Sequence, residues 1–368
     1  MREWLKKRSV LNCISSLVAI MAGLLLGLAL LFCFNADKAM GGFRNMMLTG
    51  ITSMDKLGKV FYTAAPLMMT GLAVGFAFKT GLFNIGASGQ YLMGAFFALV
   101  GAIQFQLPWW VCVLLAMVGG AIWGAIPGIF KAYFNVNEVI SAIMFNWIGL
   151  FIVNLTLSNM PIMLAGAWGA RTNDRTGPLA KANADAILPK MGLDELMQSS
   201  YVNIGIMIAI IFALIIWVVL TKTTFGYELK ACGYNRHASR YAGINERRNI
   251  VLSMTISGAL AGIGGAIYYL SGTAQYTLLK SLPAMGFNGI PVALLGASHP
   301  LATIFSSFFI SYLQVGGDAM QPEFAKEIID IIIAAIIYMS AFALLMQQGI
   351  GKLLSKKRKN AAEKGEKA

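Results

Sequence analysis

The sequence is poor in charge and in the side chains that enzymes and metal sites use. Only 12% of its 368 residues are charged, and only two are histidines, His237 and His299. Neither histidine has a cysteine or another histidine at metal-ligand spacing, so we expect no metal site. The sequence also contains no P-loop, no zinc motif and no Ser/His/Asp set. These absences argue against catalysis by this chain alone.

Cysteine is scarce as well, and none of the four cysteines falls in the longest polar loop of the chain. They are Cys13, Cys33, Cys112 and Cys232. Disulfides form in oxidising compartments, and that loop is the segment best suited to face one. We therefore expect four free thiols.

Apolar residues are abundant and gather in long runs. They make up 57% of the chain, and the mean hydropathy is +0.68, far outside the range of soluble globular proteins. Eight runs are almost free of charge and approach the roughly 20 residues that a membrane-spanning helix needs. These runs are 14–34, 60–78, 82–103, 109–130, 139–157, 202–220, 250–270 and 328–346. The bilayer is the solvent that this composition requires.

The segment 281–317 is apolar too, but prolines and glycines interrupt it. Pro283, Pro291 and Pro300 predict two short or broken helices in place of one straight span. Irregular backbone at membrane depth is tolerated where protein or a water-filled cavity covers it. We therefore predict an all-α, polytopic membrane bundle of eight to ten transmembrane helices with broken or re-entrant segments, eight if these pieces re-enter and ten if they cross.

The net charge of +13 is distributed in a way that indicates topology and argues against nucleic-acid binding. Lysine and arginine concentrate before the first run, in the loop 221–249 and in the tail 351–368, which we place in the cytoplasm. The loop 160–200 is nearly neutral and is expected on the outer face. Both termini are therefore expected inside.

Polar residues inside or beside the apolar runs are candidates for a solute path. Amides and hydroxyls can hydrogen-bond sugar hydroxyls and base edges, but in membrane helices they also bond neighbouring helices. The candidates are Asn84, Ser88, Gln90, Asn137, Asn146 and Asn288. Asn84 and Gln90 are six residues apart and share no face of a regular helix, but Gly81, Gly86 and Gly89 predict a broken segment that would let them meet.

Other residues in these runs have structural interpretations. Glu138 stands at the start of a span, and we expect it to pair with Lys79 or Lys131 instead of contacting solute. The pair Tyr268 and Tyr269 fits an aromatic belt at the membrane interface. Small residues around Gly262 in the run 250–270 predict close helix packing.

The basic loop 221–249 contains a short predicted helix. Asn235 can cap a helix over 236–242, and Gly243 can end it. Ala238 and Tyr241 lie on one face of that helix, where a small and an aromatic residue permit close docking of a partner. The alternative is an ordinary loop that is basic because of the topology rule.

Four separated blocks of sequence resemble one protein family. They are APLMMTGLAVGFAFKTGLFNIGASGQYLMGA (65–95), VNEVISAIMFNWI (136–148), GYELKACGYNRHASRYAGI (226–244) and GFNGIPVALLGASHPL (286–301). Their order and spacing resemble the permease subunits of ABC importers for nucleosides and simple sugars, the kind fed by basic-membrane-protein-like lipoproteins and related to branched-chain amino acid and ribose permeases. The resemblance runs from about residue 60 to 346. Ser88 is a departure, because the family usually has an acidic residue there.

The resemblance implies a non-enzymatic permease domain, 1–350, in a prokaryotic cytoplasmic membrane. It would move nucleosides or simple sugars by alternating access and hold no cofactor, since ATP and Mg would bind a partner ATPase. The other implied partners are a second permease and an external substrate-binding lipoprotein. The loop 221–249 would be the coupling loop, with ATPase contacts at Tyr227, Glu228, Ala238, Tyr241 and Gly243. The alternative function is a carrier or channel for a small polar solute that works without a motor.

Overall fold

The computed structural model describes residues 8–278 and 281–341. Every regular element in this part of the chain is helical, which confirms the prediction of an all-α membrane protein. Five helices are long and apolar enough to cross a membrane: α3 (Met54–Lys79), α5 (Trp109–Phe134), α6 (Glu138–Ser158), α9 (Gly205–Lys222) and α12 (Glu246–Tyr269). The chain forms two compact units, residues 51–312 and the two terminal segments, which we describe separately.

The terminal unit pairs the two ends of the chain. Helix α1 (Arg8–Phe34) packs along α15 (Lys326–Ala341), where Gly23 and Gly27 leave room for Ile336. These helices correspond to the predicted runs 14–34 and 328–346, although residues 342–346 lie outside the described part. Helix α2 (Ala36–Thr52) follows α1 after a single residue. Cys33 is a free, exposed thiol in this unit, whereas the side chain of Cys13 lies outside the described part.

The larger unit contains the interrupted helices that the sequence predicts. The run 82–103 forms α4 (Ala87–Leu99), a helix of 13 residues, and a π-helical turn, Val100–Gln104. The segment 281–317 forms α13 (Ala284–Leu295) and α14 (Pro300–Asp318), and the second of these continues into the terminal unit. Proline at residue 300 starts α14, where a missing N–H costs nothing. The expected break between two helices in this segment is therefore confirmed.

Helix α12 lies at the centre of the larger unit and packs against α3, α4 and α5. Its glycines allow the backbones to touch. A Cβ at Gly258 would lie 2.2 Å from the carbonyl oxygen of Gly120 on α5, and a Cβ at Gly94 on α4 would lie 2.2 Å from the Cα of Gly262. Lipid tails supply no hydrophobic force between helices, so such close contact is how membrane helices associate. The predicted small-residue packing face is confirmed.

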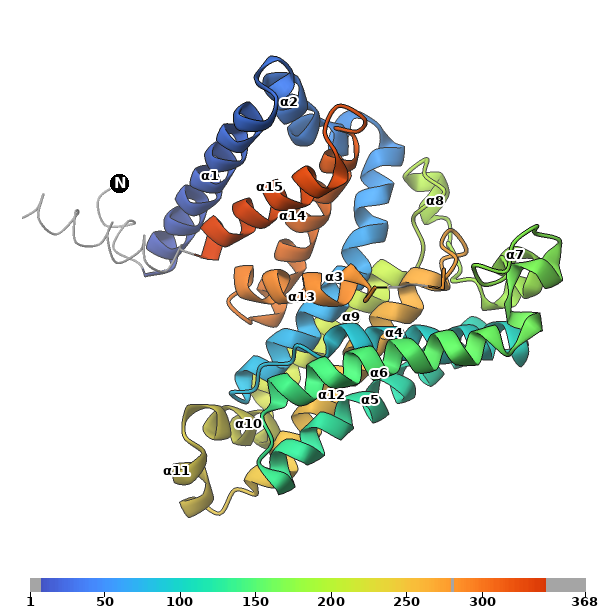
Figure 1. Cartoon of the computed structure of the whole chain (residues 1–368). Coiled ribbons are helices and arrows are strands. Elements are labelled where there is room, and N and C mark those ends of the chain that lie inside the picture. Colours follow the sequence, from blue (N-terminus) through green and yellow to red (C-terminus); the bar gives the residue numbers. More distant parts are fainter. Residues whose placement is uncertain (1–7, 279–280, 342–368) are drawn as a thin grey trace, which may run out of the picture. The chain divides into compact units, whose positions relative to one another are not determined.

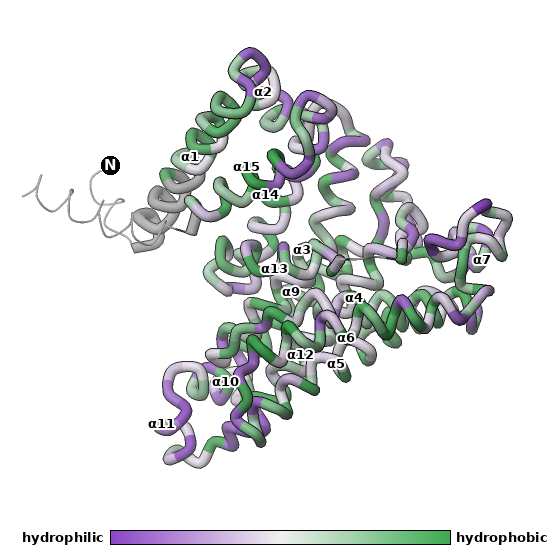
Figure 2. The backbone as a smooth tube through the Cα atoms, in the orientation of Figure 1, coloured by the Kyte–Doolittle hydropathy of each residue, from purple (hydrophilic) through white to green (hydrophobic). Residues whose placement is uncertain are grey.

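The two polar loops of this unit lie at opposite ends of the long helices. Figure 1 shows α10 (Thr224–Tyr234) and α11 (Arg236–Tyr241) at one end of α5, α6 and α12, and the loop that holds α7 (Leu179–Ala182) at the other. Figure 2 shows hydrophilic residues around α11 and near α7, with hydrophobic residues along the helices between them. This arrangement is the one expected for loops on the two faces of a membrane.

Three long helices carry exposed apolar side chains along their length. On α5 they include Leu114, Val118 and Ile122; on α6, Met144, Phe151 and Leu155; on α9, Met207, Ile211 and Val218. A soluble protein would bury such surfaces, whereas lipid or a second membrane subunit covers them without cost. Buried polar side chains, by contrast, gather in the interior around α4 and α12, among them Asn84, Gln90 and Ser257.

Candidate functional site

Asn84 and Gln90 meet in the interior because the chain between α3 and α4 is not helical. The Nδ2 of Asn84 donates to the Oε1 of Gln90 at 2.8 Å, and the Nε2 of Gln90 donates back to the Oδ1 of Asn84 at 3.2 Å. Both side chains are at most 1% exposed. Gly81, with φ of +72°, allows the chain to turn after α3. The predicted broken segment is confirmed.

This amide pair is tied to α12 and α3 through one serine. The Nδ2 of Asn84 also donates to the Oγ of Ser257 at 2.7 Å, and that hydroxyl donates to the carbonyl of Ala73 at 2.6 Å. Ser257 is fully buried. An amide without a partner at this depth would cost free energy, so the bonds hold three elements in register.

Ser88 is buried at the point where α4 meets α13. Its Oγ donates to the carbonyl oxygen of Pro283 at 2.8 Å, and a Cβ at Gly286 would lie 2.2 Å from the Cα of Ser88. A hydroxyl is a donor and suits a carbonyl, whereas an ionised carboxylate only accepts. The carbonyl of Pro283 is therefore a suitable partner for serine at position 88 and an unsuitable one for an acidic residue.

Asn146 connects α6 to the start of α4. Its Oδ1 accepts from the backbone N–H of Gly89 at 2.8 Å, and its Nδ2 donates to the carbonyl of Ile85 at 3.1 Å. Asn146 is 1% exposed. The amide satisfies backbone groups that the interrupted helix leaves without partners, which is one of the two roles expected for such a residue.

Asn137 and Asn288 lie apart from this cluster. Asn137 is exposed and caps α6, with its Oδ1 accepting from the N–H of Val139 at 2.9 Å. Asn288 is half-buried on α13, and among the described residues it has no hydrogen-bond partner. Beside the cap, the carboxylate of Glu138 contacts the Nζ of Lys131 at 2.8 Å, which confirms the helix-end ion pair.

The buried polar cluster is closed in this conformation. Asn84, Ser88, Gln90 and Asn146 all hydrogen-bond protein groups, and none is more than 1% exposed. Amides and hydroxyls can equally bond the hydroxyls of a sugar or the edge of a base. A solute would gain these partners only if the helices that seal the cluster moved apart.

A cluster of tyrosines packs beyond the amides. Tyr62 stacks on Tyr268 with ring centroids 5.4 Å apart, and Tyr269 contacts Tyr91 and Tyr276 at 6.5 and 5.8 Å. Tyr269 is 6% exposed, so its assignment to an interfacial belt was wrong: packing between helices buries it. The hydroxyl of Tyr91 is buried and has no hydrogen-bond partner in the described part of the chain.

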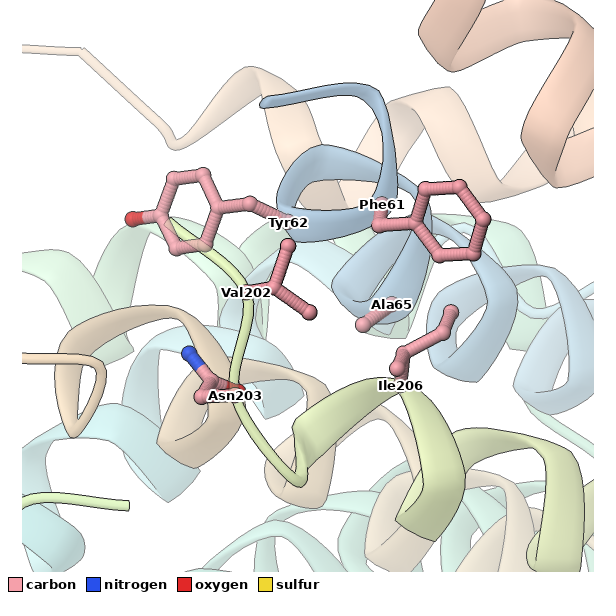
Figure 3. Close-up of a pocket in the computed structure, with 6 residues that line it drawn as sticks. All are labelled: Phe61, Tyr62, Ala65, Val202, Asn203 and Ile206. Atoms are coloured by element: carbon pink, nitrogen blue, oxygen red, sulfur yellow. The ribbon is translucent and has the colours of Figure 1, made fainter. Parts of the chain in front are cut away.

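A narrow crevice lies beside Tyr62, between the third turn of α3 and the start of α9 with the residues that precede it. Phe61, Tyr62, Ala65, Val202, Asn203 and Ile206 line it, and Figure 3 shows the hydroxyl of Tyr62 pointing away from it. It leaves essentially no room even for a water molecule. Pockets for small molecules usually measure about 300–1,000 Å³, so this crevice is too small to be a solute site in this conformation.

The loop 221–249 presents most of its candidate contact residues to solvent. Asn235 caps α11, with its Oδ1 accepting from the N–H of Ala238 at 3.0 Å, and Gly243 follows the helix with φ of +78°. Both predicted ends of this short helix are confirmed, although α11 is one residue shorter than expected. Tyr241 is 95% exposed and Tyr227 is 67% exposed.

Ala238 and Gly243 are exposed as well, but Glu228 differs from the other four candidates. It is half-buried, and its Oε2 accepts from the Nδ2 of Asn249 on α12 at 3.2 Å. Four of the five candidates thus form an open surface, while Glu228 holds the loop against the bundle. Asn249, Ser253 and Ser257 were not among the predicted site residues, although their spacing of four in one apolar helix was a signal that could have identified them.

Comparisons with known proteins place this geometry in a family. Residues 56–341 match the family described as branched-chain amino acid transport system / permease component. The guanosine ABC transporter permease protein NupP of Bacillus subtilis is 37% identical, over 92% of this chain and 96% of the relative. The nucleoside ABC transporter permease protein NupB of Lactococcus lactis is 36% identical, over 96% of this chain and 97% of the relative.

The glucose ABC transporter permease protein TsgB13 of Haloferax volcanii is 29% identical, over 87% of this chain and 84% of the relative. No solved structure matches the chain. The family match covers most of the chain, and its relatives are themselves permeases of nearly the same length. This protein is therefore a multi-pass membrane protein that belongs to the permease component family of branched-chain amino acid-type ABC transport systems.

Proposed function

We propose that this chain is the membrane subunit of an ATP-driven importer for nucleosides and works by alternating access. The observation that carries the proposal is its 36–37% identity to two nucleoside permeases over more than nine-tenths of its length. The similarity to a glucose permease is lower, at 29%, so nucleosides are preferred over simple sugars. A buried network of amides and hydroxyls fits a solute that carries both sugar hydroxyls and a base.

The proposal includes three protein partners. The first is a cytosolic ATPase that binds ATP and Mg, because this chain is a membrane subunit whose sequence contains no P-loop. A second permease completes the path: the chain is also 27% identical to NupQ, a second guanosine permease of the same Bacillus, over 68% of its length. An external substrate-binding lipoprotein delivers the nucleoside to the face that carries the loop 160–200.

In this scheme both termini and α11 lie in the cytoplasm, and α11 rests on the ATPase. Tyr227, Ala238, Tyr241 and Gly243 form the exposed contact surface. Closure of the ATPase would rock the long helices as rigid bodies and part the walls around Asn84, Gln90 and Asn146. The amides would then exchange protein partners for solute partners, with Ser88, Asn137 and Asn288 as further positions on the path.

The experiment is import of tritium-labelled guanosine by the complete complex in proteoliposomes, with ATP inside and the binding protein outside. Tyr241→Glu and Ala238→Arg should abolish ATP-dependent import and release the ATPase, because each places a charge or bulk on the docking face. Tyr241→Phe keeps the ring and should retain import. Tyr234→Glu is a matched control, since Tyr234 is 91% exposed in the same loop but lies outside α11.

The rival function is a carrier or channel without a motor. Guanosine import by the isolated chain under a proton or sodium gradient, with no ATP and no ATPase, would establish the rival and refute the proposal. The described spans contain few ionisable residues, and Glu138 already pairs with Lys131, so we expect no such import.

A further inference from the structure

One stripe of α12 carries three buried polar residues at intervals of four. Asn249, Ser253 and Ser257 are 1%, 0% and 0% exposed, respectively. Residues four apart lie one above another on a helix, so the three side chains form a column along one side. Serine and asparagine are costly in an apolar interior unless each finds a partner.

The lowest residue of the column contacts the loop that carries α11. The Nδ2 of Asn249 donates to the Oε2 of Glu228 at 3.2 Å and lies 3.7 Å from the Sγ of Cys232, both on α10. The same Sγ lies 3.5 Å from the Oγ of Ser239 on α11. Asn249 is therefore bonded to the segment that supports the exposed docking surface.

The two upper residues contact the interrupted segment between α3 and α4. The hydroxyls of Ser253 and Thr80 lie 2.7 Å apart, and Thr80 is the residue directly after α3. Ser257 accepts from the Nδ2 of Asn84 at 2.7 Å and donates to the carbonyl of Ala73 at 2.6 Å. One side of a single helix thus joins the loop at one end of the unit to the amide pair in its interior.

We propose that Asn249, Ser253 and Ser257 are positioning residues that pass movement of α10 and α11 to the Asn84–Gln90 pair, so that ATP hydrolysis is coupled to opening of the solute path. This inference rests on the proposed function. We name the three residues and their partners the α12 ladder. Asn249, Ser253 and Ser257 themselves touch neither ATP nor solute and act through their partners Glu228, Thr80 and Asn84.

Helix α12 makes two kinds of contact, and they differ in how firmly they fix the helix against its neighbours. On another side of the helix, Gly258 and Gly262 meet the backbone of α5 at Gly120 with no side chains between them. Such contacts are close but carry no directional bond, so helices can slide there. The ladder bonds are directional, and those of Ser253 and Ser257 are buried, so α12 should keep its register with the segment 80–90 and with α10 when it moves against α5.

The test compares single substitutions within the full complex by two rates, guanosine import and ATP hydrolysis. Ser257→Ala and Asn249→Ala should lower the guanosine imported per ATP hydrolysed by about threefold to about eighteenfold, the range that loss of one interhelical hydrogen bond in a membrane supports. The ATPase should still co-purify with both variants, since the docking surface is untouched. Thr80→Val and Ser253→Ala should each lower the same ratio, and the double variant should lower it no further.

The matched control is Thr255→Val on the same helix. The hydroxyl of Thr255 bonds the carbonyl of Val251 within α12 and lies off the ladder, so this change should leave import per ATP as in the wild type. If Ser257→Ala does not fold, Ser257→Cys keeps an atom at the Oγ position and replaces the strong hydrogen bond with a weak one. Wild-type import per ATP in the ladder variants would overturn the inference, provided Tyr241→Glu still uncouples. Wild-type import in Tyr241→Glu would instead overturn the proposed function, and the inference with it.

Discussion

The contact between α12 and α5 makes a sharp prediction for the substitution Gly258→Ala. A Cβ at this position would lie 2.2 Å from the backbone oxygen of Gly120, which is 1.2 Å closer than the 3.4 Å where ordinary contact begins. A backbone carbonyl cannot rotate aside as a side chain can. The two helices would have to separate, and that separation would also loosen the neighbouring contact at Gly262.

The magnitude follows from two opposing effects. Overpacking of a tight interior typically costs about 1–3 kcal/mol. Replacing glycine by alanine inside a helix returns about 1 kcal/mol because alanine has the higher helix propensity. Gly75→Ala in α3 is the matched control, since a Cβ there would meet its nearest atom at 3.6 Å, an ordinary distance. The difference between the two variants therefore isolates the cost of overpacking.

The assay is thermal unfolding of the purified protein in mild detergent, followed by the fluorescence of its seven tryptophans. We expect Gly258→Ala to unfold at a lower temperature than the wild type and Gly75→Ala at an equal or higher temperature. A Gly258→Ala protein as stable as Gly75→Ala would show that α12 and α5 do not touch at this glycine, and the central packing described above would be refuted.

Three further substitutions test other parts of the structure. Tyr91→Phe should raise the unfolding temperature, because it removes a buried hydroxyl that has no hydrogen-bond partner among the described residues and costs about 1–3 kcal/mol. Tyr276→Phe should lower the unfolding temperature, because it breaks the 2.9 Å bond to Asn154. A lower unfolding temperature for Tyr91→Phe would contradict this explanation. Ser88→Asp should sharply reduce the yield of folded protein, because an ionised carboxylate would face the carbonyl of Pro283. Ser88→Ala should lower the stability by only about 1 kcal/mol. Equal yields of the two variants would show that the Pro283 carbonyl does not disfavour a carboxylate at position 88. Asn235→Ala should speed hydrogen exchange at Ala238 by removing a cap worth about 0.5–2 kcal/mol, with exchange in α12 unchanged as the internal control.

Several structural features could be predicted from the sequence alone. The length of the apolar runs predicted helices that became α3, α5, α6, α9 and α12, because crossing a bilayer demands about 20 apolar residues with all backbone groups bonded internally. The cap at Asn235 and the ion pair of Glu138 with Lys131 were also predictable. Both are local: their partners lie within a few residues, and the rules that govern them act at short range.

The roles of the polar residues could not be read from sequence in the same way. Asn84, Asn137 and Asn288 look alike as single amides near apolar runs, yet the first is buried in a network, the second caps an exposed helix end and the third is half-buried without a described partner. Tyr269 looked like an interfacial residue and is buried. In each case the outcome depends on which other element lies opposite.

The sequence by itself determined that this chain is a helical membrane protein, where its spans and breaks fall, and which family of permeases it resembles. These properties follow from composition, run length and motif spacing, all of which are local to the chain. Only the tertiary structure decided that Ser257 meets Asn84, 173 residues away, and that Asn249 meets Glu228. Buried polar groups must find partners, but the choice of partner is made by the packing of helices that are distant in sequence.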